Sequence, residues 1–343
     1  MKSVHPNFDI LLELPEYLGK KVLFISEITP DRKKNYNWIP SKGIKQIIYQ
    51  GIKAIDMAWQ LLKTKEPYDI VIIFEHKPWY SILLYLVCAI KNKPTFFIIH
   101  GYQQTYRLSK IRTLGFKLFL FFEKRFEFYP IHLEKTDCDF DNCLKFNKSG
   151  IFMLIPLPDP SSLRLNKSIN NSVLKIGIVG MIRPDKPIMP IIKILENYSS
   201  SIVTIETYIG TPFWQVPSEL KKGSIKLIDT TSEQQYTAFI QSLDIVINYY
   251  DKEHFYYRSS GVLNDAVWGG CFVIVPDYPV LKEQISNPVK VGETYENVED
   301  IKNAIDKSID YLTNNVVEFE EWRQIRTKER ILKDLSKQIL DVL

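Results

Sequence analysis

Short apolar runs alternate with helix-compatible stretches along almost the whole chain, and this alternation restricts the fold more than any other feature. The runs are rich in Ile, Val and Phe and contain few polar residues, which is typical of strands covered on both faces. Strands separated by helices predict right-handed crossovers and parallel sheets. The expected strands are 21–25, 69–74, 94–99, 127–133, 151–155, 174–179, 202–209, 225–228, 244–248 and 272–275, and the longer expected helices are 43–63, 79–91, 187–197, 232–243, 297–312 and 319–340.

This pattern predicts an α/β protein with two Rossmann-like, doubly wound domains that face a central cleft. The chain has 343 residues, which is more than one typical domain core uses. Prolines at 156, 158 and 160, followed by a polar run, indicate a hinge. The expected boundaries are 1–160 for an N-terminal domain, 161–172 for a linker, 173–325 for a C-terminal domain and 326–343 for a final helix that could pack back on the first domain.

Composition and termini exclude several classes of protein. Lys and Arg total 44 against 40 for Asp and Glu, and a net charge of +4 gives no argument for a nucleic-acid partner. No run of about 18 uncharged apolar residues is present, which excludes an ordinary membrane span. The N-terminus lacks a signal-peptide pattern. Cys138 and Cys143 have no second Cys/His pair to complete a metal site, and we expect a reduced, cytoplasmic protein, with a position at the inner face of the membrane left open.

One stretch of the second half reads as an anion-binding helix start followed by a buried strand. Ser259, Ser260 and Gly261 offer small side chains and free backbone N–H groups where a helix would begin, and such a terminus attracts phosphate. Asp265 follows about one turn later, where it would suit a ribose hydroxyl. Gly269 then ends the helix before an apolar strand. These features together predict a site for a nucleoside diphosphate, although Ser and Gly also favour helix starts without any ligand.

The C-terminal half resembles the GT-B glycosyltransferases, specifically the retaining family 4 type that uses nucleotide-sugar donors. The resemblance is carried by the order of three motifs and a long final helix: IGIVGMIRPDK at 176–186, SEQQYTAFIQSLDIVINYY at 232–250 and SSGVLNDAVWGGCFVIVPDYPVL at 259–281. It covers about half of the chain well. The N-terminal half matches only through its architecture and through His100 and Gly101 at the end of a strand.

The loop after the first strand of the second half supplies two cations beside Gly180, namely Arg183 and Lys186. A departing nucleoside diphosphate gains negative charge during glycosyl transfer, so fixed cations lower the barrier without a metal ion. The resemblance implies this role for Arg183 and Lys186, because the matching Arg and Lys of similar enzymes perform it. An isolated basic turn of this kind would otherwise be read as a solvated surface feature.

The resemblance also implies a pair of glutamates eight positions apart. In this chain only the second position is acidic, and it is occupied by Asp265. The first position falls on Tyr257. Arg258 or Glu253 could substitute for the missing glutamate, and the retention of anomeric configuration is left open. Arg258 is included with the donor-binding residues.

Further candidates come from the ends of other strands. Thr230 and Leu227 are expected to lie after the strand that usually flanks the nucleotide base in similar enzymes. Similar enzymes place a His facing the transferred sugar at the position of His100, although a single His at a strand end is equally well a structural residue. His76 and Glu75 are alternative groups on the acceptor side, and a general base for the acceptor hydroxyl would come from this face.

The segment 106–129 interleaves basic residues with Leu, Ile and Phe. Such a segment can lie in a bilayer interface, with its cations over anionic head groups. A core helix with extended basic side chains fits the same pattern. Peripheral membrane contact is the preferred interpretation, and no recognised motif supports binding of single-stranded nucleic acid.

The leading hypothesis is therefore a metal-independent hexosyltransferase-type enzyme. It would transfer a sugar from a nucleotide-sugar, its substrate, to a hydroxyl of a glycan or lipid-linked saccharide in surface polysaccharide or glycoconjugate synthesis, and it would need no cofactor. The alternative is a non-catalytic nucleotide or nucleotide-sugar binding module, which the missing glutamate favours. An epimerase or a phosphorylase on the same fold is a third possibility.

Overall fold

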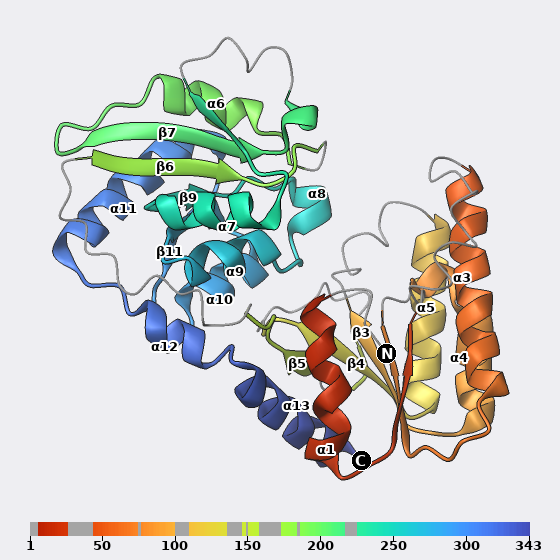
Figure 1. Ribbon diagram of the computed structural model, residues 1–343. Coiled ribbons are helices and arrows are strands. Elements are labelled where there is room, and N and C mark those ends of the chain that lie inside the picture. Colours follow the sequence, from red (N-terminus) through yellow and green to blue (C-terminus); the bar gives the residue numbers. More distant parts are fainter. Residues whose placement is uncertain are drawn as a thin grey trace. The chain divides into compact units, whose positions relative to one another are not determined.

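A computed structural model describes residues 6–26, 44–74, 77–99, 110–135, 146–148, 150–157, 173–183, 186–216 and 225–343. The expected linker at 161–172 lies outside these residues. The chain divides into two compact units, of which unit 1 comprises Met1–Pro156 and Lys328–Leu343 and unit 2 comprises Leu157–Thr327. Each unit contains one parallel sheet with helices around it (Figure 1). The predicted α/β class is thereby confirmed.

The sheet of unit 1 has five parallel strands that follow one another in chain order. They are β1 (Val22–Ile25), β2 (Ile70–Ile73), β3 (Thr95–Ile99), β4 (Phe128–Leu133) and β5 (Ile151–Met153). Every residue of β2 and β3 is buried, as expected for uninterrupted apolar runs covered on both faces.

Helices cover both faces of this sheet. One face carries α3 (Ile44–Lys63), η2 (Pro78–Tyr80), α4 (Ile82–Lys91) and α5 (Lys110–Arg125), whose apolar residues share a core cluster with the strands. The other face carries η1 (Pro6–Glu13), α1 (Leu14–Leu18) and α13 (Lys328–Val342), which form a second cluster. Within the described residues, no helix combines the length and the apolar character that crossing a bilayer requires.

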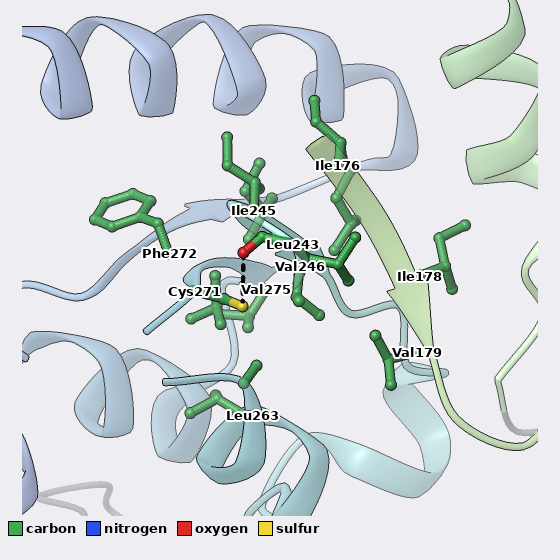
Figure 2. Packing of buried hydrophobic residues seen from close by; sticks show 14 of the residues in the cluster. Ile176, Ile178, Val179, Leu243, Ile245, Val246, Leu263, Cys271, Phe272 and Val275 are labelled. Carbon is green, nitrogen blue, oxygen red and sulfur yellow. Dashed lines mark hydrogen bonds between the residues drawn. The ribbon is translucent and has the colours of Figure 1, made fainter. Parts of the chain in front are cut away.

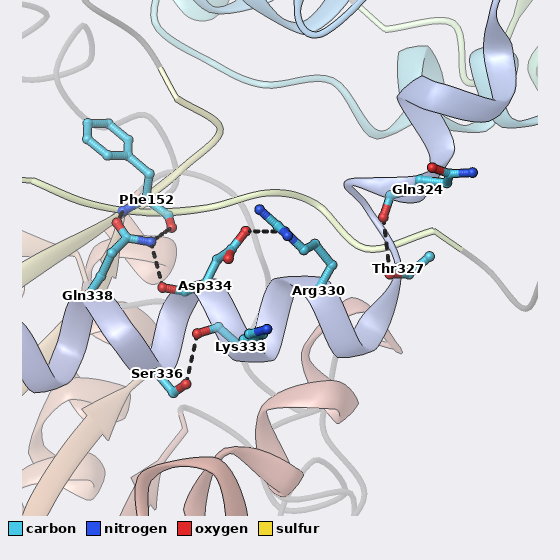
Figure 3. A network of polar contacts seen from close by, with 8 residues as sticks. All are labelled: Phe152, Gln324, Thr327, Arg330, Lys333, Asp334, Ser336 and Gln338. Carbon is cyan, nitrogen blue, oxygen red and sulfur yellow. Dashed lines mark hydrogen bonds and ion pairs between the residues drawn. The ribbon is translucent and has the colours of Figure 1, made fainter.

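The last helix of the chain packs on unit 1 through β5. The side-chain amide of Gln338 bonds to both backbone groups of Phe152: it accepts from the Phe152 N–H at 2.9 Å and donates to the carbonyl oxygen at 3.0 Å (Figure 3). The backbone of strand β5 thus gains a side-chain partner from the C-terminal segment. On the exposed side of α13, Arg330 pairs with Asp334 at 2.8 Å.

The prediction of a single helix over 319–340 is wrong. The structure has α12 (Phe319–Gln324) and α13, with a break at 325–327. At the break the Leu157 N–H donates to the Arg326 carbonyl oxygen, and the Thr327 hydroxyl donates to the Gln324 carbonyl oxygen at 3.2 Å (Figure 3). These bonds use carbonyl groups that an unbroken helix would pair internally, and the break lies where the chain passes from unit 2 to unit 1.

The sheet of unit 2 has six parallel strands in the order β11-β10-β9-β6-β7-β8. They are β6 (Val173–Val179), β7 (Thr204–Thr211), β8 (Lys226–Asp229), β9 (Ile245–Ile247), β10 (Phe272–Pro276) and β11 (Gly292–Tyr295). The chain builds outward from β6 to β8 and then returns to the other side of β6 with β9. The strand order therefore reverses between β6 and β9, and a crevice is expected at the carboxyl ends of these two strands.

Buried Ile, Val, Leu and Phe side chains join this sheet to its helices. Figure 2 shows part of this cluster, in which the Cys271 thiol donates to the Leu243 carbonyl oxygen at 3.3 Å. The helices are α6 (Met189–Glu196), η5 (Phe213–Gln215), α7 (Glu233–Ser242), α8 (Lys252–Phe255), α9 (Gly261–Trp268), α10 (Pro279–Ser286), η7 (Val298–Asp300), α11 (Ile301–Asn314) and α12. The sequence interpretation did not include α10 or β11.

Candidate functional site

A small pocket lies at the reversal of strand order in unit 2. The part of its lining that can offer polar groups comes from residues after β6 and after β9, namely Gly180, Lys186, Asn248, Tyr249 and Tyr250. Apolar residues from the strand ends and the following loops complete it: Ile178, Val179, Met181, Ile182, Ile188, Ile209 and Ile247. The pocket is thus at the place where the topology of a doubly wound sheet leaves a binding crevice.

Gly180 brings the loop after β6 next to the first turn of α9. Its φ of +107° is a conformation that L side chains rarely adopt, and its N–H donates to the Gly210 carbonyl oxygen at 2.9 Å. A Cβ atom added at Gly180 would lie 3.5 Å from Cγ2 of Val262, the second residue of α9. The two predicted phosphate-binding segments therefore meet within one unit.

Arg183 and Lys186 form a tight turn beyond Gly180. Their backbones make an antiparallel bridge, in which the Lys186 N–H donates to the Arg183 carbonyl oxygen at 2.8 Å. The Lys186 ammonium lies 4.9 Å from the centre of the Tyr250 ring and 5.8 Å from that of Phe255. Lys186 is half-buried at the pocket, whereas Arg183 is exposed.

Tyr250 is the residue around which the candidate cations gather. Burial raises the pKa of its hydroxyl, while the positive charges of Arg183 and Arg258 oppose that rise. The Arg258 guanidinium also lies 4.6 Å from the centre of the Phe255 ring, which stacks on the Tyr250 ring at 4.2 Å. The sequence analysis did not select Tyr250, because a Tyr after a buried strand carries no distinctive motif.

The first turn of α9 keeps two backbone donors free among the described residues. Ser260 is the N-cap, and its hydroxyl accepts from the Leu263 N–H at 3.1 Å. The Ser260 N–H itself donates to the Gln284 side chain at 3.1 Å. The N–H groups of Gly261 and Val262 have no partner within the described chain, and Gly261 is exposed. The Ser260 hydroxyl can therefore cap the helix while the N–H groups of Gly261 and Val262 bind an anion. Ser259 lies just before the cap and is half-buried.

Asp265 lies one turn further along α9. Its carboxylate accepts from the Tyr236 hydroxyl of α7 at 2.8 Å. Burial raises the pKa of Asp265 to about 6, and the bond from Tyr236 acts in the opposite direction. At neutral pH the carboxylate form therefore predominates, and it can accept hydrogen bonds from a hydroxyl group.

The region of the missing glutamate brings Arg258 to the site. Tyr257, at the position in question, is half-buried with its ring 4.7 Å from that of Tyr256. Glu253 is exposed in the first turn of α8, where its N–H bonds to Asp251. Of the two proposed substitutes, Arg258 is the one whose charge acts on Tyr250.

Two buried hydroxyls mark the ends of β7 and β8. Thr230 follows β8 directly, and its N–H donates to the carbonyl oxygen of Thr211, the last residue of β7. Neither side-chain hydroxyl has a hydrogen-bond partner within the described residues. Leu227 lies inside β8, half-buried. Thr230 thus lies at the carboxyl edge of the sheet. Leu227 is the second residue of β8, so it lies within the strand and not after it.

Some sequence candidates cannot be positioned. His100, Glu75 and His76 lie outside the described residues, as do Cys138 and Cys143. Among the residues that the structure describes, no three His, Cys, Asp or Glu side chains form a group that could hold a metal ion.

No family model matches the sequence, and no curated protein does. Solved structures match it over nearly its full length. The Anabaena protein HepE in complex with UDP-glucose is 12% identical, with 99% of this chain and 98% of that chain covered at a TM-score of 0.61. The trehalose-6-phosphate synthase OtsA is 10% identical, with 99% and 95% covered at a TM-score of 0.65. The chain has the GT-B fold.

A third match to the GT-B fold is the α,α-trehalose 6-phosphate synthase of Burkholderia multivorans. It is 10% identical, with 88% of this chain and 75% of that chain covered at a TM-score of 0.61. At sequence identities this low, the structural matches show the fold of this chain and do not assign a role to any of its residues.

Proposed function

We propose that this protein is a glycosyltransferase, which moves a sugar from a nucleotide-sugar donor to a hydroxyl of a glycan or lipid-linked saccharide. The observation that carries the proposal is the approach of Lys186 and Arg258 to the stacked rings of Tyr250 and Phe255, beside the free amides of α9. Arg183 belongs to the same turn as Lys186. Structures with the same fold hold UDP-glucose and UDP. A diphosphate is the ligand that cations and a helix N-terminus together would suit.

In the proposed reaction, the bond between the anomeric carbon and the phosphate oxygen of the donor breaks. The bonding electrons stay with the leaving nucleoside diphosphate, whose negative charge therefore grows. Lys186 and Arg183 stabilise this charge together with the amides of Gly261 and Val262. These fixed donors do the work for which other enzymes use a metal ion.

The rest of the donor would be held by groups near this centre. The Asp265 carboxylate would accept hydrogen bonds from the ribose hydroxyls, and the unpaired hydroxyl of Thr230 would meet the base. His100 remains our candidate for a residue that faces the transferred sugar. The acceptor hydroxyl loses its proton as it attacks the anomeric carbon. We expect the base that takes this proton to lie on the acceptor side of the donor, as His100 would.

The proposal is tested by titrating the protein with UDP, GDP and dTDP in the presence of EDTA, followed by turnover assays with the matching sugar donors. We expect one nucleotide to bind and its sugar donor to be hydrolysed or transferred without a divalent metal. Binding without any turnover would favour the non-catalytic module. Binding of none of the three would contradict the proposed function.

We further propose that unit 1 contacts an anionic bilayer, which would bring the enzyme to a lipid-linked acceptor. The exposed side chains of α4 are all apolar, and those described on α3 and α5 are only apolar or basic. They are Ile55, Trp59, Leu62 and Lys63 on α3, Ile82, Leu83, Leu86 and Ile90 on α4, and Lys110, Ile111, Leu114, Lys117, Phe121, Lys124 and Arg125 on α5.

These three helices form one layer on the same face of the unit 1 sheet (Figure 1), and the exposed residues belong to that layer of helices. Apolar side chains interspersed with cations and without exposed acids complement an interface of acyl chains and anionic head groups. The basic segment of α5 predicted from the sequence is one part of this layer. The central helix α4 adds a strip of exposed residues that are all apolar, in a segment expected from the sequence only to be a helix.

The membrane proposal is tested by cosedimentation with phosphatidylcholine vesicles, with and without phosphatidylglycerol. We expect binding that requires the anionic lipid, and we expect Leu86→Glu to weaken it about tenfold, because a charge would enter the apolar strip. Leu340→Glu is the matched control: Leu340 lies on α13, on the opposite face of the sheet, and is 44% exposed against 46% for Leu86. Equal binding of both variants would contradict the proposal.

A further inference from the structure

The buried side chain of Asn248 has an amide nitrogen without a hydrogen-bond partner among the described residues. Asn248 follows β9 directly, lines the pocket and is only 3% exposed. Its Nδ2 atom makes no hydrogen bond to any residue that the structure describes. Buried polar atoms are normally paired, and an unpaired buried donor destabilises the folded protein. A donor left unpaired at the wall of a pocket indicates a ligand that accepts from it.

The other end of the same amide belongs to an oriented chain of hydrogen bonds. The Leu263 N–H donates to the Ser260 hydroxyl at 3.1 Å, and that hydroxyl lies 2.5 Å from the Tyr250 hydroxyl. Tyr250 in turn donates to Oδ1 of Asn248 at 3.1 Å. Because the Tyr250 proton is used on Asn248, Ser260 supplies the proton for the bond between the two hydroxyls.

This chain leads from the first turn of α9 to the pocket. Each donor points toward Asn248, so the polarity of the helix N-terminus is passed along the series. A side-chain amide that accepts at its oxygen becomes a better donor at its nitrogen. Lys186 lines the same pocket, and an anionic ligand there would therefore meet both a cation and a neutral donor.

Two hydrogen bonds to its own backbone groups keep Asn248 in position, and a third bond holds the backbone of Tyr250. The Asn248 N–H donates to the Ile274 carbonyl oxygen at 2.8 Å, and the Asn248 carbonyl oxygen accepts from the Tyr295 hydroxyl at 3.0 Å. The Tyr278 hydroxyl donates to the Tyr250 carbonyl oxygen at 2.8 Å. The free amide is thus held at the pocket wall before any ligand arrives, which lowers the entropy cost of binding.

We propose that Asn248 Nδ2 donates a hydrogen bond to a phosphate oxygen of the nucleoside diphosphate, and that Tyr250 and Ser260 are positioning residues for this donor. The inference rests on the proposed function, since it assigns a further contact within the same site. It adds a neutral donor to the pocket that Lys186 also lines, and no motif in the sequence indicates it.

The test compares nucleotide and nucleoside binding in variants of the whole protein. Asn248→Asp keeps the shape of the side chain but replaces its donor with an anionic acceptor. We expect it to weaken the binding of whichever of UDP, GDP or dTDP the wild type binds by about tenfold or more, as for the loss of a hydrogen bond to a charged group. Binding of the matching nucleoside, which lacks phosphate, is expected to be unchanged.

Tyr250→Phe removes the hydroxyl that orients Asn248, and a loss of about threefold to tenfold in diphosphate affinity is expected from it. Tyr278→Phe is the matched control, because it also deletes a tyrosine hydroxyl that bonds to the same segment but lies outside the oriented chain. Circular dichroism and thermal unfolding identify any variant that fails to fold, in which case Tyr250→Phe carries the test.

Diphosphate binding by Asn248→Asp as tight as that of the wild type would overturn the inference and leave the proposed function standing. So would equal losses for nucleoside and nucleotide, or equal losses in Tyr250→Phe and Tyr278→Phe. If the wild type binds none of the three nucleotides, the proposed function itself fails.

Discussion

The two units contain sheets of the same kind but expose different chemistry. Unit 1 has its strands in simple chain order, and the helices on one face present apolar and basic side chains to the outside. Unit 2 reverses its strand order between β6 and β9, and cations, free amides and a buried carboxamide converge at the reversal. The comparison indicates that strand order, more than composition, decides where a parallel sheet can collect polar groups for a ligand.

The largest expected effect comes from the cationic turn. Lys186→Ala should reduce sugar transfer about 100-fold to 1,000-fold, because it removes a fixed positive charge that stabilises the negative leaving group. Vesicle binding through unit 1 should be unchanged in the same variant. Steady-state kinetics and cosedimentation measure the two effects. Lys193→Ala, an exposed lysine on α6, is the control, and a similar loss of activity there would show that general charge is responsible.

Gly180 tests whether the crevice of unit 2 depends on backbone geometry. Gly180→Ala should lower the free energy of unfolding by about 1–2 kcal/mol, because alanine at a φ of +107° is strained. Nucleotide affinity should fall as well, since the turn moves away from α9. Gly261→Ala is the matched variant: it has an ordinary φ and nothing within 4 Å of an added Cβ. Urea unfolding measures both free energies of unfolding. An equal loss in Gly180→Ala and Gly261→Ala would contradict the role of the backbone conformation at Gly180.

The raised pKa of Asp265 predicts that nucleotide binding by unit 2 depends on pH. Its pKa is raised to about 6 by burial, so the carboxylate that would accept from a ribose is lost as the pH falls through 6. Nucleotide affinity should therefore drop severalfold between pH 7.5 and 5. Asp265→Asn should bind more weakly at pH 7.5 and lose this dependence, as calorimetric titration would show. An unchanged pH profile in the variant would exclude Asp265 as the titrating group.

The same ionisation affects stability with a defined sign. A carboxyl group whose folded pKa lies above its ordinary value destabilises the fold when it is charged. The wild type should thus gain stability relative to Asp265→Asn as the pH falls from above 6 toward 4. Denaturant unfolding at several pH values measures this difference, and a gain in the opposite direction would contradict the raised pKa.

The smallest effects concern the attachment of the C-terminal helix to unit 1. Gln338→Ala removes two hydrogen bonds to the backbone of Phe152, and a loss of about 1–2 kcal/mol in unfolding free energy is expected. Arg330→Ala breaks an exposed pair with Asp334 and should cost at most about 0.5 kcal/mol. Reversed magnitudes in denaturant unfolding would show that α13 is held by its charges instead.

Most of the fold could be predicted because the strands are continuous apolar runs. Strands such as β2, β3 and β10 are buried throughout, and their short length and their content of Ile, Val and Phe favour a strand over a buried helix. The strand β11 was missed because its sequence, GETY, is short and half polar. The break between α12 and α13 was missed because it depends on a hydrogen bond from Leu157, far away in the sequence.

The candidate site was predictable only where it follows a local motif. Ser260 as an N-cap and the turn of Arg183 and Lys186 can be recognised from neighbouring residues. Tyr250 and Asn248 could not be recognised, because their significance arises from contacts with α9 and α10 rather than from their own segment. Tyr236, which holds Asp265, lies 29 positions away in the sequence and belongs to a different helix.

The central claim is that unit 2 binds a nucleoside diphosphate between the turn of Lys186 and the first turn of α9. A crystal structure of the protein soaked with the nucleotide that it binds, chosen from UDP, GDP and dTDP, tests this directly. We predict phosphate oxygens within hydrogen-bonding distance of the Lys186 ammonium, the Gly261 and Val262 amides and the Asn248 carboxamide. A nucleotide bound elsewhere in the molecule, with these groups free of phosphate, would contradict the account.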